Sequence, residues 1–226
     1  MADTLQEGIR LFRLKRWEGA LREFLAVDSG RFDPERSAEL AYYMGLCYTK
    51  LERYDDALLY LEQVVTSGAD PLRGIQCRLT LAYIYAITRR SKLAEFELKQ
   101  LMDSGCESIQ IYTTLAYAAW TQKQYEKAVE YYRSALDIDS NNATALNGLG
   151  YILADAAIDP VRGLYYCKKA VDKRPHNAAY LDSLGWAYYK NGEFVEARDY
   201  LRRAYELAPH QEEIRGHLKA LVGVSP

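Results

Sequence analysis

The chain has 226 residues, of which 49% are hydrophobic and 27% charged, as in an ordinary folded protein. Lysine and arginine total 29, against 31 aspartates and glutamates, so the sequence lacks the cationic excess on which nucleic-acid binding depends. It contains no apolar run of the roughly 18 residues that a membrane-spanning helix needs, and no integral membrane segment is predicted.

A repeated pair of small residues organises the sequence. The first recurs at intervals of 34 to 37 residues and, after the first repeat, follows a large apolar residue: Gly8, Gly45, Ala82, Ala116, Gly150 and Gly185. The second lies twelve residues later, or thirteen in the fifth repeat: Ala20, Ala57, Ala94, Ala128, Gly163 and Ala197. Around both, apolar residues recur at spacings of three and four, which is typical of one helix face. We therefore expect two helices per repeat that approach closely at the small residues.

This periodicity predicts six helical hairpins in residues 1–209. Their boundaries are expected at about 1–36, 37–73, 74–107, 108–141, 142–176 and 177–209. The first two repeats carry three extra residues each, near Ser29 to Pro34 and near Ser67 to Pro71. These insertions leave the helix lengths of the first two repeats open.

The remaining residues, 210–226, are predicted to form a capping helix and a tail. In the segment Gln211 to Val222, the apolar residues Ile214, Leu218 and Leu221 lie on one side of a helix, with charged residues elsewhere. A stack of repeats needs a terminal element with one apolar and one polar face. This segment has that pattern.

The pattern resembles the tetratricopeptide-repeat (TPR) family. The closest matches are the fourth repeat, from Tyr112 to Ser140, and the sixth, from Leu181 to Pro209. The resemblance covers nearly the whole chain and departs from the family in the first repeat, where Glu7 replaces an apolar residue. It implies an all-α superhelical solenoid of six helix-turn-helix repeats with a C-terminal capping helix. The concave surface of such a solenoid is lined mainly by the first helix of each repeat.

By this resemblance, the concave groove carries few net charges and many polar aromatic residues. The charged groove positions balance: Arg13, Lys50 and Lys190 against Glu39, Asp155 and Asp182. No three successive repeats present the Lys/Asn/Arg clamp with which some TPR cochaperones hold a chaperone's C-terminal carboxylate, so that function is rejected. Aromatic residues with a polar tip are favoured binding anchors. The expected partner-binding groove comprises Tyr83, Tyr117, Asn147, Tyr151, Trp186 and Tyr189. The competing interpretation is that some of these side chains merely fill the inside of the superhelix.

A second candidate surface lies at the N-terminal end. No preceding repeat covers the apolar stripe of Leu5, Ile9, Phe12 and Leu46. An exposed apolar patch usually marks a contact surface, so a role in partner binding or self-association is open. The alternative is that the helices curl enough to shield this stripe themselves.

The resulting functional expectation is a scaffold or adaptor that binds a peptide or helix of a partner protein in its concave groove. The alternative is a permanent structural subunit of a larger multiprotein assembly, of the secretion or motility apparatus type. RNA binding through helical repeats is disfavoured by the balanced charge. The basic residues of the second helices are interspersed with acids, which favours a solvated face over an anionic-ligand site.

No enzyme, cofactor or metal site is predicted. The sequence has no His-x-x-x-His pair, phosphate-binding glycine loop or Gly-x-Ser-x-Gly motif. None of the four cysteines forms a Cys-x-x-Cys pair, and Cys47 and Cys167 are expected to be buried in the core. That usage fits a reducing compartment. The first residues lack a secretory signal, so a cytoplasmic location is expected, or a periplasmic or membrane-anchored one if a leader was removed.

Overall fold

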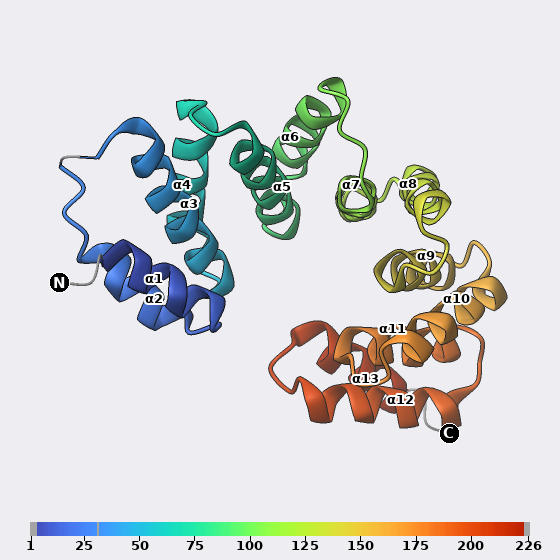
Figure 1. Cartoon of the computed structure of the whole chain (residues 1–226). Helices are drawn as coiled ribbons and strands as arrows, with labels where there is room; N and C mark the ends of the chain where they lie inside the picture. Colours follow the sequence, from blue (N-terminus) through green and yellow to red (C-terminus); the bar gives the residue numbers. More distant parts are fainter. Residues whose placement is uncertain (1–3, 31, 224–226) are drawn as a thin grey trace. The chain divides into compact units, whose positions relative to one another are not determined.

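The computed structural model describes residues 4–30 and 32–223. These residues form thirteen α-helices, of which the first twelve are arranged as six antiparallel pairs (Figure 1). By contact clustering the chain consists of two compact units, Met1–Cys106 (unit 1) and Glu107–Pro226 (unit 2). Unit 1 holds three helix pairs: α1 (Thr4–Arg13), α2 (Trp17–Leu25), α3 (Pro34–Lys50), α4 (Tyr54–Ser67), α5 (Pro71–Ile87) and α6 (Ser91–Asp103).

Unit 2 holds three further pairs and a final single helix. These are α7 (Ile109–Thr121), α8 (Tyr125–Ile138), α9 (Ala143–Asp155), α10 (Pro160–Lys173), α11 (Ala178–Lys190), α12 (Phe194–Leu207) and α13 (Glu212–Val222). The prediction of an all-α fold with six helix-turn-helix repeats and a C-terminal capping helix is therefore confirmed. One buried apolar cluster of unit 2 lies among α7, α8 and α9, and a second extends from α9 to α13.

The small residues mark close helix contacts, as predicted. A Cβ atom on Gly45 would lie 2.8 Å from the side chain of Leu61, and one on Gly185 would lie 2.7 Å from Leu201. Among the glycine positions, the closest approach to the backbone of a neighbouring helix is between α9 and α10. A Cβ on Gly163 would lie 2.7 Å from the carbonyl oxygen of Gly150. Glycine is therefore required on both helices of this pair.

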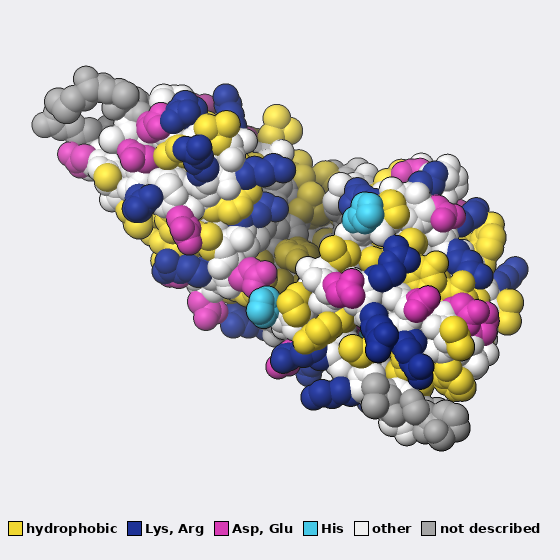
Figure 2. All heavy atoms as spheres, turned by 90° about the horizontal axis from the view of Figure 1, so that it is seen from below, with side chains coloured by type: hydrophobic (Ala, Val, Ile, Leu, Met, Phe, Trp, Pro, Cys, Tyr) yellow, Lys and Arg dark blue, Asp and Glu magenta, His cyan; other side chains and the backbone are white. Residues whose placement is uncertain are grey.

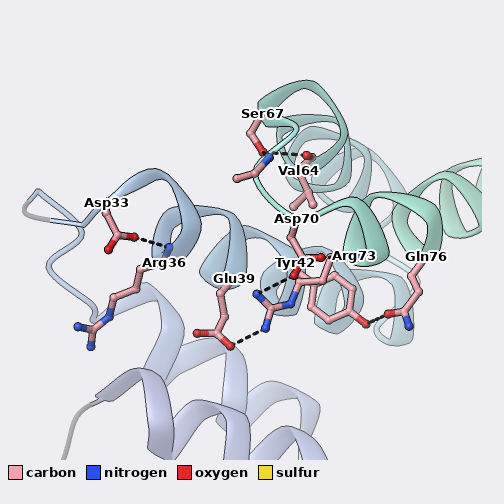
Figure 3. A network of polar contacts seen from close by, with 10 residues as sticks. Asp33, Arg36, Glu39, Tyr42, Val64, Ser67, Asp70, Arg73 and Gln76 are labelled. Carbon is pink, nitrogen blue, oxygen red and sulfur yellow. Dashed lines mark hydrogen bonds and ion pairs between the residues drawn. The ribbon is translucent and has the colours of Figure 1, made fainter.

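The insertions in the first two repeats lengthen helices. Helices α3 and α5 each have 17 residues, whereas α7, α9 and α11 each have 13. The side chains of Asp33 and Asp70 cap these two helices by accepting hydrogen bonds from the backbone N–H of Arg36 and Arg73, at 2.7 and 3.0 Å (Figure 3). A proline follows each cap at the first helical position. Helices α3 and α5 accordingly begin at Pro34 and Pro71, three residues before the approximate starts expected for the second and third repeats.

The extra residue of the fifth repeat lies in a turn. Three residues connect the two helices of every other hairpin, whereas four, residues 156–159, connect α9 and α10. The added length ends at Asp159, whose side chain accepts a hydrogen bond from the backbone N–H of Arg162 at 3.0 Å. The insertion is thus absorbed before α10 begins.

All six hairpin turns contain a residue in the left-handed conformation, seven positions after the first small residue. It is glycine only in the sixth repeat: Lys15, Glu52, Arg89, Lys123, Ala157 and Gly192, with φ between 53° and 80°. The backbone N–H of Gly192 and Glu193 donate to the carbonyl oxygens of Tyr189 and Tyr188, both at 3.0 Å. This geometry closes the first helix of each hairpin and turns the chain into the second.

Exchanging glycine and alanine at this position is expected to have opposite effects in two repeats. A left-handed alanine carries a steric penalty of about 1–2 kcal/mol, and glycine loses about 0.5–1 kcal/mol in extra unfolded-state entropy. Gly192→Ala should therefore lower the free energy of unfolding by about 0.5–1 kcal/mol, and Ala157→Gly should raise it by a similar amount. Urea titration followed by circular dichroism tests this. Shifts of the same sign in both variants would contradict it.

The predicted burial of Cys47 and Cys167 is confirmed, and Cys77 is buried as well. Burial raises the pKa of Cys47 and of Cys77 to about 12, so both thiols are neutral near neutral pH. Neutral buried thiols are poor nucleophiles and metal ligands. These cysteines act as small apolar core residues.

The described residues show neither a membrane-spanning helix nor a metal-binding cluster. None of the helices described here combines the length and apolar character needed to cross a lipid bilayer. The same residues contain no cluster of three or more histidine, cysteine or acidic side chains positioned for a metal ion.

Candidate partner-binding site

Unit 2 contains a pocket of about 200 Å³ on the inner side of its first helices. Its lining comes from α7, α9 and α11, from Tyr132 of α8, and from the start of α13. The pocket lies within the last three repeats and the capping helix, and three of the predicted groove residues, Tyr117, Asn147 and Tyr151, line it.

Three partly exposed aromatic rings form one side of this pocket. Tyr117 and Trp120 are three residues apart on α7 and therefore lie on the same helix face. Their ring centroids are 5.5 Å apart, and Trp120 meets Tyr151 of α9 edge-on, at 5.6 Å and an interplanar angle of 79°. Mutual packing of this kind holds the rings in place before any partner arrives.

Gly148 allows a fourth ring to form the base of the pocket. A Cβ atom at this position would lie 2.1 Å from the ring of Tyr132, so any side chain would displace that ring. Tyr132 is buried, and burial raises the pKa of its hydroxyl. The ring thus contributes an apolar surface to the pocket.

Polar contacts one repeat apart join the first helices beneath the pocket. The side-chain amide of Asn147 donates to the hydroxyl of Ser183 at 3.1 Å, and Thr144 is hydrogen-bonded to Tyr180 at 3.0 Å. The carbonyl oxygen of the Asn147 side chain is buried and has no hydrogen-bond partner among the described residues. A buried acceptor without a partner is destabilising, and a donor from a ligand would relieve it.

The capping helix packs against α12 and α11, and two of its side chains contact Tyr151 of α9. His217 of α13 lies 2.9 Å from a carboxylate oxygen of Asp182, and these side chains are only 11% and 6% exposed. The histidine ring stacks on Trp186 with centroids 4.1 Å apart. Nearer the start of α13, Glu213 accepts a hydrogen bond from the hydroxyl of Tyr151 at 3.2 Å.

Sequence reasoning missed the Asp182–His217 pair. The available signal was the position of His217, three residues after Ile214 and four before Leu221, on the apolar face of the capping helix. A histidine on that face needs a buried partner. Asp182 occupies a predicted groove position and supplies it.

The six predicted groove residues are in three different settings. Tyr117, Asn147 and Tyr151 meet at the pocket. Trp186 stacks on both His217 and Tyr189, and its indole N–H donates to Asp155 at 2.8 Å. These contacts hold Trp186 and Tyr189 within unit 2. Tyr83 belongs to unit 1, where its side chain is 49% exposed, and its role stays a prediction.

The predicted N-terminal apolar patch is not an exposed stripe. Leu5 and Ile9 are buried, with exposures of 1% and 4%. Phe12 is half-buried, its ring packing edge-on against Trp17 and Tyr43 with centroids 5.0 and 5.3 Å away, and Leu46 is also half-buried. The expectation of an exposed surface is wrong for Leu5 and Ile9, because α1 packs these side chains against its neighbours.

In unit 1, polar side chains of α3 and α5 contact one another. The guanidinium of Arg73 lies 2.7 Å from a carboxylate oxygen of Glu39, and the hydroxyl of Tyr42 is hydrogen-bonded to Gln76 (Figure 3). These pairs join α3 to α5 across one repeat. The inner side chains at this position thus satisfy one another.

The electrostatic character of the unit 2 pocket is acidic. Its described lining residues include Asp182 and Glu213 and no lysine or arginine. Burial, and then the nearby negative charges of Glu213 and Asp155, raise the pKa of the Tyr151 hydroxyl. Elsewhere both signs of charge are interspersed, as on the face drawn in Figure 2.

Three family models match the chain. A TPR repeat matches residues 116–155, and tetratricopeptide repeats match residues 178–211 and 5–72, together more than half of the sequence. The chain is a tetratricopeptide-repeat protein. The predicted family is thereby confirmed.

Relatives of this TPR protein are longer. It is 27% identical over 169 residues to the TPR repeat-containing protein PA4667 of Pseudomonas aeruginosa, covering 75% of this chain and 28% of that protein. It is 24% identical over 193 residues to the human protein O-mannosyl-transferase TMTC1, covering 81% and 21%. The chain thus spans less than a third of the length of these curated relatives.

Solved structures share the fold. A tetratricopeptide repeat protein from Parabacteroides merdae superposes with a TM-score of 0.78 at 13% identity, covering 97% of this chain and 83% of that one. YrrB, a TPR protein with an unusual peptide-binding site, gives a TM-score of 0.53 at 15% identity, covering 80% and 92%. At these identities the likeness concerns the fold.

Proposed function

We propose that this TPR protein is a non-catalytic interaction module that binds a segment of a partner protein in the pocket of unit 2. The observation that carries the proposal is the set of pre-packed, partly exposed rings of Tyr117, Trp120 and Tyr151 that line the pocket. Rigid aromatic anchors bind with little loss of side-chain entropy, and they dominate many protein interfaces. The same fold in the peptide-binding protein YrrB is compatible with this function.

The state of two buried thiols and of the buried histidine–carboxylate pair favours binding over catalysis. The buried thiols of Cys47 and Cys77 are neutral, and the pocket histidine–carboxylate pair is enclosed by α13 and α11. In the described part of the chain the cysteines are free thiols, which supports the cytoplasmic location that belongs to this proposal.

The second candidate function is that of a permanent structural subunit of a larger assembly. It is supported by the exposed apolar side chains of second helices, notably Val161 on α10 and Val195 on α12. Burial of Leu5 and Ile9 reduces the apolar surface that the N-terminal end could offer to such an assembly.

A pull-down from native lysate distinguishes the two functions. The test variant is Tyr117→Ala/Trp120→Ala, and its matched control is Tyr165→Ala/Tyr205→Ala, which removes two exposed rings from second helices. We expect a bound protein to be lost from the test variant and kept by the control, with helicity unchanged in both. Retention by the test variant and loss from the control would contradict pocket binding and favour the structural subunit.

A further inference from the structure

The size of the unit 2 pocket suits a single side chain. Its volume of about 200 Å³ is below the roughly 300 Å³ at which sites for small molecules and cofactors begin. A partner segment that crosses the inner face could therefore place one side chain in it. The chemistry of the lining indicates which kind.

The aromatic rings that line the pocket are inclined to one another at large angles. Trp120 is tilted by 45° from Tyr117 and by 79° from Tyr151, and the ring of Tyr132 lies beside Gly148. Several aromatic faces around one space attract a cation, because each face carries the negative part of the ring quadrupole. A neutral apolar side chain would gain only from burial.

Acceptors surround these rings. The carboxylate of Glu213 accepts from the hydroxyl of Tyr151 at 3.2 Å, which places it at the edge of the aromatic wall. Asp182 lines the pocket from α11, where His217 contacts it. Basic side chains carry several N–H donors and no acceptor, so they match all of these groups.

The charges on neighbouring elements leave the pocket acidic. Lys190 lies 3.5 Å from Asp155 and therefore neutralises that carboxylate. His217 is the described basic group nearest to Asp182, at 2.9 Å. Glu213 lies at an exposed position on α13, and no lysine or arginine is among the described residues that line the pocket.

We propose that the pocket of unit 2 receives a lysine or arginine side chain of the partner segment, held between the rings of Tyr117, Trp120 and Tyr151 and paired with Glu213. This inference rests on the proposed function, because it requires that a segment binds on the inner face. It adds the chemistry of recognition: the partner presents a basic residue at one fixed position.

The test uses the full chain and a displayed library of random peptides, with counter-selection on the Tyr117→Ala/Trp120→Ala variant. We expect enriched peptides to share a lysine or arginine at one position. Replacing that residue by citrulline or norleucine in a synthetic peptide should weaken binding by about tenfold, as expected for a partly desolvated cation–aromatic contact. The readout is the dissociation constant from isothermal calorimetry.

The variant Glu213→Gln tests the same ion pair from the side of the protein, by removing the negative charge proposed to pair with the peptide's basic residue. The amide can still accept from Tyr151, so the variant removes charge without removing this hydrogen bond. The selected peptide should bind it about fivefold more weakly, the upper end for a partly exposed ion pair. The control is Glu212→Gln, which loses the same charge from the same helix at a side chain that is 92% exposed and lies 3.6 Å from Arg215. Its affinity should be unchanged.

The possible failures are distinguishable. If no peptide is enriched over the counter-selection, the proposed function is contradicted together with this inference. If enriched peptides lack a common basic residue, or bind Glu213→Gln and Glu212→Gln equally well, the inference alone is overturned and peptide binding stands.

Discussion

Replacing Gly163 with alanine is expected to lower the free energy of unfolding by about 3 kcal/mol, near the upper end for overpacking. The new Cβ atom would lie 2.7 Å from the carbonyl oxygen of Gly150 and 2.8 Å from the backbone nitrogen of Ala154. Neither atom can rotate away, because both belong to the backbone of α9. Helices α9 and α10 would have to separate, losing contacts throughout the adjoining cluster of apolar side chains.

The matched control for this prediction is Gly216→Ala. Gly216 lies inside α13 with nothing within 4 Å of a Cβ atom built on it. The same chemical change should there raise the free energy of unfolding by about 0.5–1 kcal/mol, through the lower unfolded-state entropy of alanine. Urea titration followed by tryptophan fluorescence measures both variants. A stability loss below about 1 kcal/mol for Gly163→Ala would contradict the close approach of α9 and α10.

Replacing His217 with alanine is expected to destabilise the docking of α13 by about 3 kcal/mol, because it leaves the buried carboxylate of Asp182 without its partner. The variant also loses the stacking of the imidazole on Trp186. We expect the backbone amides of α13 to exchange with deuterium about a hundredfold faster, since each 1.4 kcal/mol of opening free energy corresponds to about a factor of ten.

His210→Ala is the control for this change. His210 is exposed and lies in the turn before α13, so its replacement should leave the exchange of α13 unchanged. A double variant, His217→Ala/Asp182→Ala, measures the coupling between the two side chains. Unaltered exchange of α13 in His217→Ala would show that its apolar residues, and not the buried pair, hold the capping helix in place.

The fold was predictable because its determinants are local and repeated. Gly45 and Gly185 lie where a Cβ atom would collide with the next helix, and such a requirement is visible as a period in the sequence. The start of α3 is also encoded locally, because Asp33-Pro34 is a typical N-cap followed by a proline at the first helical position. The repeat spacing alone gives a later start for this helix. The left-handed backbone conformation of the turn residues was not predictable from composition, because five of the six residues are not glycine.

The candidate site was predictable only in part, because it depends on contacts between elements. Position within the repeat identified Tyr117, Asn147 and Tyr151, which meet at the pocket. Position alone could not show that α13 turns back over Trp186, or that Glu213 is hydrogen-bonded to Tyr151. The burial of Leu5 and Ile9 was missed for the same reason, since the shielding depends on how neighbouring helices pack.

The four-residue turn between α9 and α10 indicates a position at which the chain tolerates an inserted residue. The turn of the fifth hairpin is longer than its five counterparts by one residue, yet Asp159 still caps α10 and Gly163 still meets Gly150. One additional residue in this turn therefore leaves the packing of α9 against α10 intact. Ile158, which is 49% exposed in this turn, is accordingly a suitable place for attaching an epitope or a spectroscopic label away from the pocket-lining residues.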